Sequence, residues 1–381
     1  MKERLDRWMF ESFSLDPRSL GVARIFIGLY LVLYRTGDLR WIDTLPSSFF
    51  RPPPGPLRLL GGIPSSGALT AVSVGLSVAS VALLVGYHTR LASCATGALL
   101  FLVDGLGYSF GHVHHSDTFL TAVVVIMAGS NWGAAYSIDA LRRRDRAAAP
   151  VQAWPIALAA VLLGFLMLTA GLPKLATGWL DPSVLAVRDH IVHLHFASPT
   201  AGHLATLALD SENPWLWKPF DYLTLWLELG FIFAITSPRA TRSFCAAAVL
   251  FHLGILLTFD IDFTGNVVAY AIFFEWSYVV DRARPLQRFP WATAFARRAR
   301  LTLARSRAPI GAAVFAAGVA LYLVTRRVGK PAEYVAGWIT TRPGRVAPLV
   351  LFVFVLPIAV AYLVAALSSR FHLPGAKLRK A

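Results

Sequence analysis

The chain has 381 residues, of which 56% are hydrophobic and only 15% are charged, and its mean hydropathy is +0.57. Soluble domains carry about 25% charged residues, so this composition argues against an ordinary soluble domain and indicates a protein that crosses a membrane several times. The formal net charge of +15 does not indicate nucleic-acid binding. The basic residues lie in short clusters between apolar segments, which is the usual pattern beside membrane spans.

Apolar stretches recur along the chain at the length that a bilayer requires, about 20 residues. We predict an all-α fold, a polytopic integral membrane helical bundle with about ten transmembrane helices. Residues 1–18 are amphipathic and carry acids, unlike a cleavable signal peptide. The candidate spans are Ser19–Tyr34, Ala68–Gly86, Leu91–Phe110, His115–Trp132, Trp154–Leu172, Tyr222–Ile235, Ser243–Phe259, Phe263–Val280, Pro309–Val324 and Ala347–Leu367.

Basic residues fall unevenly on the two sides of these spans. With the N-terminus inside, Lys and Arg favour the inside connections by roughly two to one. "LRRRDR" at 141–146 and the Arg-rich stretch 282–307 are the strongest inside anchors. We therefore expect a multi-pass protein of the cell (inner) membrane with both termini in the cytoplasm.

This orientation gathers titratable side chains on the outer face. The stretch "GYSFGHVHHSDTFL", residues 107–120, lies there, as does the long connection after the fifth span. Three interpretations of "HVHH" stay open: zinc or copper ligation, acid/base work, and a solvated or interfacial loop. We expect no metal, since this spacing is no established metal site by itself, and the residues alone leave the other two interpretations open.

Polar residues also lie within the predicted spans, where an ionisable group is costly and usually faces a cavity or a partner. They are Arg24, Asp104, Glu228, His252, Asn266 and Tyr270. For Arg24 the simplest interpretation is structural pairing, for example with Glu228 or Asp104. For His252 a structural hydrogen bond and a functional role are equally good interpretations.

A lone lysine follows the fifth span in "LTAGLPKLATGWLDP". Physical chemistry alone favours snorkelling, in which Lys174 keeps its stem in lipid and its ammonium at the headgroups. The alternative is a partly desolvated amine that is neutral often enough to act as a base.

Several stretches occur in an order that carries further information: "SLGVARIFIGLYLVLYRTGDL", "LLVGYHTRLASCATGALLFLVDGLGYSFGHVHHSDTFL", "HSDTFLTAVVVIMAGSNWGAAYSIDAL", "GLPKLATGWLDPSVL", "WLELGFIFAI" and "FHLGILLTFDIDFTGNVVAYAIFFEW". Together they resemble the transmembrane module shared by vitamin K-dependent gamma-carboxylases and their bacterial relatives, the HTTM proteins. The likeness covers residues 15–285. It implies a domain over 1–285, followed by two additional transmembrane helices with basic flanks in 286–381.

The resemblance implies an activity. In the carboxylases the matching lysine deprotonates vitamin K hydroquinone, O2 adds, and a strongly basic alkoxide forms on the way to the epoxide. That base removes the γ-proton of a glutamate, and CO2 traps the carbanion. An apolar, water-poor site suits this chemistry because water would quench the alkoxide. By resemblance Lys174 is the base, and His115, or His114 in the alternative register, assists the carbanion step. The residues expected to line the quinone site are Arg24, Glu228, His252, Asn266 and Tyr270.

The chain departs from the carboxylases in two respects. Only about 100 residues follow the region of resemblance, so we expect no counterpart of the large lumenal domain, and His252 is followed by "LGI" where the family has an asparagine. A small glutamate-like substrate, or quinol chemistry without carboxylation, is therefore easier to accommodate than a docked peptide. The first hypothesis is an enzyme that uses a reduced vitamin K-type quinone, O2 and CO2 at the outer face. The second is a non-catalytic quinone- or lipid-binding or peptide-maturation membrane protein, with a transporter or a His-ligated metal protein ranked below.

Overall fold

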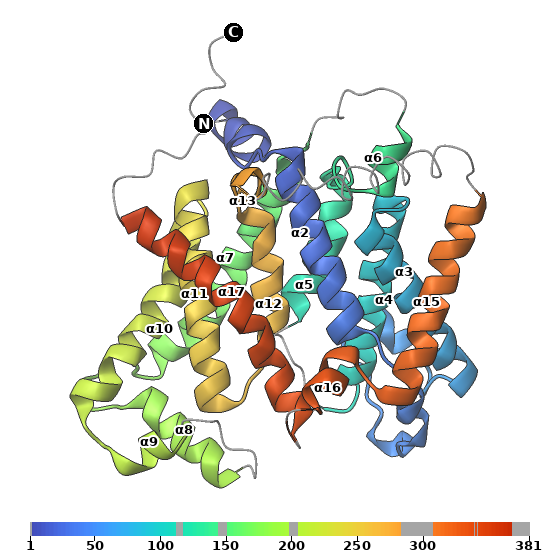
Figure 1. Cartoon of the computed structure of the whole chain (residues 1–381). Coiled ribbons are helices and arrows are strands. Elements are labelled where there is room, and N and C mark those ends of the chain that lie inside the picture. The colour runs from blue at the N-terminus through green and yellow to red at the C-terminus, as the bar shows by residue number, and fades with distance from the viewer. Residues whose placement is uncertain are drawn as a thin grey trace. The chain divides into compact units, whose positions relative to one another are not determined.

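We describe the protein from a computed structural model, which covers residues 2–111, 117–143, 151–197, 205–282, 308–338, 340 and 342–367. Every regular element in these ranges is a helix (Figure 1). The all-α prediction is therefore confirmed. The chain divides into two compact units, Met1–Ala160 with Val268–Ala347 and Val161–Val267 with Pro348–Ala381. The predicted domain boundary at residue 285 lies outside the described residues.

Seven helices of the described chain are long and apolar enough to cross a membrane. They are Pro17–Thr44, Ser66–Val85, Thr89–Tyr108, Trp154–Ala176, Pro238–Phe259, Ile310–Val328 and Pro343–Ala366. Each overlaps one predicted span, so the polytopic helical membrane bundle is confirmed. The count of about ten is not confirmed.

Three predicted spans differ from the structure. Those at His115–Trp132 and Phe263–Val280 hold apolar helices only over Thr118–Gly129 and Thr264–Phe273. At 1.5 Å per residue, such helices are too short to cross about 30 Å of hydrocarbon by themselves. The third, Tyr222–Ile235, has the wrong start.

The helix that contains it, α10, begins at Pro214 and ends at Ala234. Two charged residues, Lys218 and Asp221, precede the predicted start at Tyr222. In the structure these two side chains pair with each other inside the helix, which allows the helix to continue through both charges.

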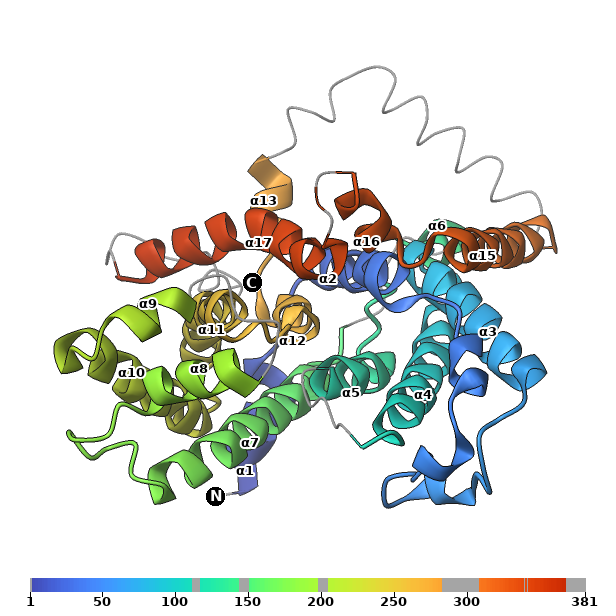
Figure 2. The same cartoon turned by 90° about the horizontal axis from the view of Figure 1, so that it is seen from below.

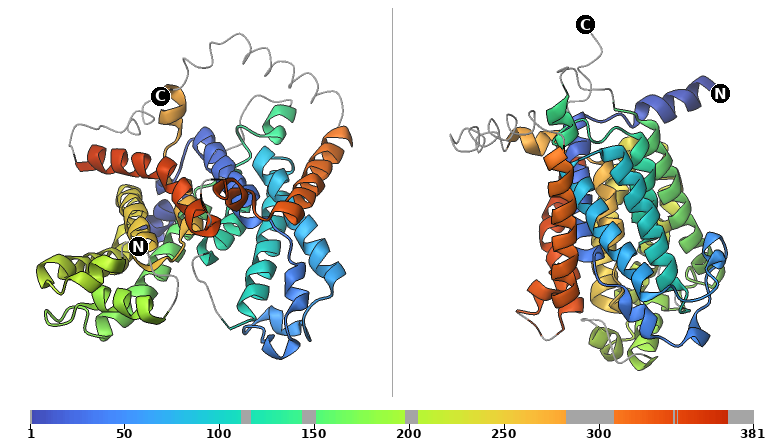
Figure 3. Two further views of the ribbon diagram at one scale, coloured as in Figure 1. Left: turned by 60° about the horizontal axis from the view of Figure 1, so that its bottom comes forward. Right: turned by 90° about the vertical axis from the view of Figure 1, so that its right-hand side faces the viewer.

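The first unit is built around α2 (Pro17–Tyr30), α3 (Ser66–Val85), α4 (Thr89–Tyr108), α5 (Thr118–Ile126) and α15 (Ala308–Val328), with α3 packed against α2, α4 and α15 (Figure 3). Its shorter elements are α1 (Lys2–Arg7), η1 (Trp8–Ser12), η2 (Leu31–Arg35), η3 (Arg40–Thr44), η4 (Ser47–Phe49), η5 (Pro56–Leu59), η6 (Met127–Gly129), α6 (Ile138–Arg142), η7 (Tyr270–Phe273), α13 (Ser277–Arg282) and α16 (Pro331–Ala336).

Glycines let the helices of this unit approach closely. A Cβ added to Gly28 of α2 would lie 2.6 Å from the Cα of Leu84, and one on Gly318 of α15 would lie 2.4 Å from the Cα of Val78. Membrane helices gain little from the hydrophobic effect between them, so such close van der Waals packing holds them together. Helix α15, from the last quarter of the chain, is thus part of the packing of the first unit.

Arg24 of α2 is fully buried and caps the end of α3. Its Nη1 donates to the carbonyls of Leu83 and Leu84 at 2.5 and 2.6 Å, and its Nη2 donates to the Tyr136 carbonyl at 2.6 Å. The last carbonyls of a helix have no partner within it, so the guanidinium supplies one. The suggested pairing of Arg24 with Asp104 is wrong, because Arg35 binds Asp104 instead.

The second unit holds most of α7 (Trp154–Ala176) and α17 (Pro343–Leu367), with α8 (Ala186–Ala197), α9 (Ala205–Asp210), α10 (Pro214–Ala234), α11 (Pro238–Phe259) and the start of α12 (Thr264–Ala269). α10 and α11 run side by side (Figure 1), and α8 and α9 pack against them (Figure 2). Asn213 starts α10 by accepting a hydrogen bond from the Trp215 backbone, with Pro214 at the first helical position.

Candidate functional site

Lys174 lies in the last turn of α7 and pairs with Glu228 of α10. Its Nζ donates to both carboxylate oxygens, at 2.7 and 2.8 Å, and to the carbonyl of Ala170 at 3.2 Å. The side chain of Glu228 is only 6% exposed, whereas that of Lys174 is 27% exposed. The ammonium is therefore held on a buried carboxylate, in contrast to the snorkelling interpretation. Whether the lysine acts as a base stays a prediction.

Two glycines bring α7 and α10 close enough for this pair to form. A Cβ on Gly171 would lie 2.8 Å from Cδ2 of Leu229 and 3.1 Å from Cβ of Glu228. One on Gly164 would lie 2.9 Å from Cγ2 of Ile235. Both glycines therefore face α10, at positions two turns apart on α7. Lys174 follows Gly171 by three residues and so lies on the same face of the helix.

The chain reverses sharply after Lys174 and places Trp179 over its side chain. Gly178 has a left-handed φ of +84°, and the Trp179 N–H donates to the Lys174 carbonyl at 3.3 Å. This is the Schellman arrangement that ends many helices, and it favours glycine because other residues are strained at such a φ. The indole ring centre lies 5.5 Å from the Lys174 Nζ, a cation–π distance.

An apolar groove of about 700 Å³ lies along α7, α10 and the start of α11, and neither Lys174 nor Glu228 lines it. It is lined by Leu175, Leu180, Tyr222, Leu225, Trp226, Leu229, Gly230, Phe233, Ala234, Ala240 and Phe244. Leu175 and Leu229 directly follow Lys174 and Glu228 in sequence, so the groove runs along the same stretch of α7 and α10. Its volume is within the range of about 300–1,000 Å³ that small-molecule sites occupy.

His252 and Asn266 lie in the same unit and are buried. The imidazole of His252 stacks on the ring of Phe263, with a centroid distance of 4.7 Å. Asn266 follows Phe263 by three residues, and its Oδ1 has no hydrogen-bond partner among the described residues. A buried amide oxygen without a partner is costly, and a ligand hydroxyl would satisfy it.

His190 of α8 is a further titratable group near the pair. Its ring lies 5.3 Å from that of Phe259. The pKa of His190 is lowered from its usual value, first because burial disfavours the imidazolium, and also through the neighbouring charges of His193 and Lys174. The sequence places His190 in the long connection after the fifth span, on the predicted outer face.

The first unit holds the other predicted residues. The Tyr270 ring is buried and lies 6.1 Å from that of Phe119. Arg35 joins the end of the first span to Asp104 of α4 and, at 2.7 Å, to Asp117 at the start of α5. His114 and His115 fall in residues 112–116, outside the described chain. Among the described residues no group of three His, Cys, Asp or Glu side chains is arranged to hold a metal.

Comparison with known proteins shows the family. The family model of the HTTM domain matches residues 13–278. The chain belongs to the HTTM family. HTTM domains occur in membrane proteins related to vitamin K-dependent carboxylases, so the family suggested by the sequence motifs is confirmed. No curated protein and no solved structure matches the chain.

Sequence reasoning missed three residues that lie around Lys174 and the loop after it: Trp179, Lys218 and Asp221. The predicted span starts after Lys218 and Asp221, although their spacing of three residues is that of a helical ion pair. The Gly178-Trp179 pair directly after the helix was the available signal, because glycine there predicts a Schellman turn.

Proposed function

We propose that this HTTM protein is an enzyme that removes a proton from a reduced vitamin K-type quinone, with the Lys174–Glu228 pair as the proton-handling group. The observation that carries the proposal is the ion pair at 2.7 and 2.8 Å between α7 and α10, two helices that also line an apolar groove. When bound, the hydroquinone would supply an acidic hydroxyl and, with O2 and CO2 as co-substrates, the oxidising and carboxylating chemistry.

The pair is suited to moving a proton. Nζ of Lys174 accepts a proton only when it is neutral, and the carboxylate of Glu228 is placed to hold the proton that it releases. The two groups are already joined by hydrogen bonds, so a proton can pass from the amine to the carboxylate without any rearrangement of the helices. Catalysis by a positioned acid or base contributes about 10²–10⁴-fold.

The residues present fit an apolar, hydroxyl-bearing ligand. The groove along α7 and α10 is lined mostly by Leu, Phe, Trp and Tyr side chains, and in the same unit the Asn266 Oδ1 is a buried acceptor without a partner among the described residues. We assign supporting roles at the quinone site to Glu228, His252 and Asn266. The other two residues expected there, Arg24 and Tyr270, belong to the first unit, where Arg24 binds three backbone carbonyls. The carbanion-assisting role stays with His115 or His114.

We further propose that the site faces the outside of the cell (inner) membrane and that both termini are cytoplasmic. The support is the excess of basic residues in the connections assigned to the inside. The acceptor in this proposal is a small glutamate-like molecule or a peptide.

The test is a turnover assay on purified protein in nanodiscs with a reduced naphthoquinone. Oxygen uptake is followed, and quinone epoxide is measured by mass spectrometry. We expect Lys174→Ala and Glu228→Gln each to lower epoxide formation by about 10²-fold or more. Lys330→Ala, which removes a lysine from an exposed pair with Glu333, should retain the wild-type rate.

Two results would contradict the proposal. Epoxide formation at the wild-type rate in folded Lys174→Ala would remove the lysine from the chemistry. Quinol binding without any epoxide would favour the second hypothesis, a non-catalytic quinone- or lipid-binding or peptide-maturation role.

A further inference from the structure

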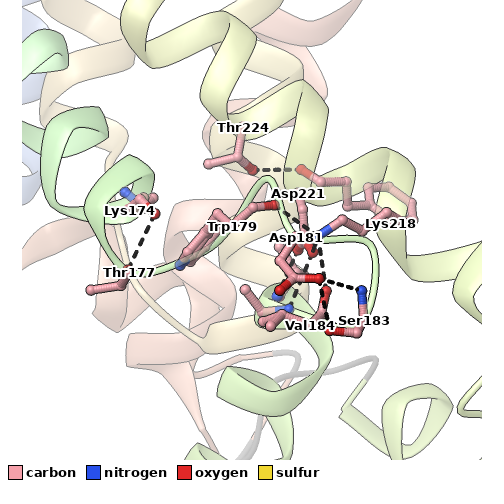
Figure 4. Close-up of polar contacts among 12 residues, drawn as sticks. Lys174, Thr177, Trp179, Asp181, Ser183, Val184, Lys218, Asp221 and Thr224 are labelled. Carbon is pink, nitrogen blue, oxygen red and sulfur yellow. Dashed lines mark hydrogen bonds and ion pairs between the residues drawn. The ribbon is translucent and has the colours of Figure 1, made fainter.

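A second lysine, the buried Lys218 of α10, holds the loop that follows Lys174. The Nζ of Lys218 donates to the carbonyls of Trp179 and Val184 at 2.7 and 2.8 Å and to Oδ2 of Asp221 at 3.1 Å (Figure 4). A lysine ammonium has three donors, and all three are used here. An apolar side chain at this position would leave two carbonyls without this donor.

Asp221 extends the same network to the next helix. Its side chain is completely buried, and its two oxygens accept hydrogen bonds from the backbone N–H groups of Ala186 and Val187, at 3.2 and 2.8 Å. These N–H groups begin α8, and a helix start needs such acceptors. One pair with i, i+3 spacing on α10 therefore fixes both the loop over residues 177–185 and the start of α8.

Trp179 is consequently held from two sides. Its N–H is bonded to the carbonyl of Lys174, and its own carbonyl is bonded to Lys218. The indole between these anchors lies 5.5 Å from the Lys174 Nζ. The first anchor is the end of α7 and the second is α10, the helix that also carries Glu228.

We propose that Lys218 and Asp221 are positioning residues that keep the indole of Trp179 over the Lys174 amine and so limit the access of water to it. A pair that served only to start α8 would need no contact with the Trp179 carbonyl. The consequence for turnover rests on the proposed function, whereas the shielding of Lys174 does not.

The first experiment measures how fast Lys174 reacts with a water-soluble amine-reactive ester, read by mass spectrometry of the full-length protein in nanodiscs. In Lys218→Met we expect labelling of Lys174 to become several-fold faster. Amide hydrogen exchange over residues 177–187 should also become faster, because the loop loses both carbonyl contacts. Lys330→Met removes a lysine with the same i, i+3 spacing from an exposed pair and should change neither.

A second variant separates the ring from the loop. Trp179→Leu should raise the labelling of Lys174 while leaving the amide exchange of residues 177–187 at the wild-type rate. It keeps the backbone carbonyl that Lys218 binds. Wild-type labelling in folded Lys218→Met would overturn the proposal. If Lys218→Met does not fold, wild-type labelling in Trp179→Leu would overturn it.

Failure of this inference can be told apart from failure of the proposed function. Faster labelling without epoxide formation by any form of the protein would support the positioning role and contradict the enzyme. Lysine-dependent epoxide formation with unchanged labelling would support the enzyme and contradict the positioning role. If both hold, Lys218→Met should lower kcat for epoxide formation more than it changes KM, because Lys218 acts through Lys174 and does not line the groove.

Discussion

At the scale of single residues, the site depends on where charges find partners. Lys174 and Glu228 satisfy each other across two helices, and Lys218 and Asp221 do so along one. Removing one member of a buried pair costs about 3–5 kcal/mol, whereas replacing both with apolar residues is often neutral. Because of this asymmetry, the effect of replacing one of these charged residues can be predicted only when its partner is known.

His190 yields a pH prediction at this scale. The pKa of His190 in the folded protein is lowered below its usual value of 6.5, first by burial and then by the charges of His193 and Lys174. The unfolded chain therefore binds the proton more readily. The stability of the fold should be fully present above pH 6.5 and should fall as the pH drops from 6.5 towards the lower folded-state pKa.

The check is the thermal unfolding midpoint in detergent as a function of pH. His190→Gln should lose part of the acid-side decrease. His193→Gln, which removes one neighbouring charge but keeps the titrating group, should lose less of it. An unchanged decrease in His190→Gln would assign the acid sensitivity to other groups.

At the scale of elements, α7 and α10 are brought together by glycines placed two turns apart. Gly171 meets Leu229 and Glu228, and Gly164 meets Ile235. The two contacts are almost equally tight, at 2.8 and 2.9 Å to the nearest side-chain carbon. Gly171 lies one turn from Lys174, whereas Gly164 lies about three turns away. Substitutions at the two glycines therefore disturb similar contacts at different distances from the ion pair.

We expect Gly171→Val to lower epoxide formation more than Gly164→Val. A side chain at Gly171 pushes α10 away where Lys174 reaches Glu228, and a displacement of about 1 Å at a reacting group can cost about 10²-fold in rate. The measurement is turnover beside thermal stability for both variants. Equal losses of activity would show that only the general packing of the two helices matters.

At the scale of the whole molecule, the sequence assigns each connection to one side of the membrane. Cys94 is exposed and lines a surface pocket with Arg90 and Asp139, next to a connection assigned to the inside. Thr177 is exposed at the end of α7, in the connection assigned to the outside. Cys245 is buried, so a thiol reagent should not label it from either side of the membrane.

We expect a membrane-impermeant maleimide added to intact cells to label Thr177→Cys in a Cys94→Ser background. Cys94 of the wild type should react only after the cells are permeabilised. The readout is a gel shift with a polyethylene-glycol maleimide. The reverse pattern would place the Lys174 side of α7 in the cytoplasm.

The sequence by itself determined that the protein is a helical membrane bundle of the HTTM family. Hydrophobic length and motif order are local properties of the chain, and seven predicted spans agree with helices that could cross a membrane. The same local signal overestimated the helices around Thr118 and Thr264 and began α10 too late. An apolar stretch does not show whether the helix within it covers its full length. A charged residue does not show by itself which side chain it pairs with.

Only the tertiary structure decided which charges meet. Arg24 was expected beside a carboxylate but lies on three carbonyls, and Glu228, one of its suggested partners, is bound by Lys174. Trp179 over Lys174 depends on a helix end, a loop and a second helix together. Such contacts join residues about 40–55 positions apart, and their geometry is set by how closely glycines let the helices pack, which no stretch of sequence records by itself.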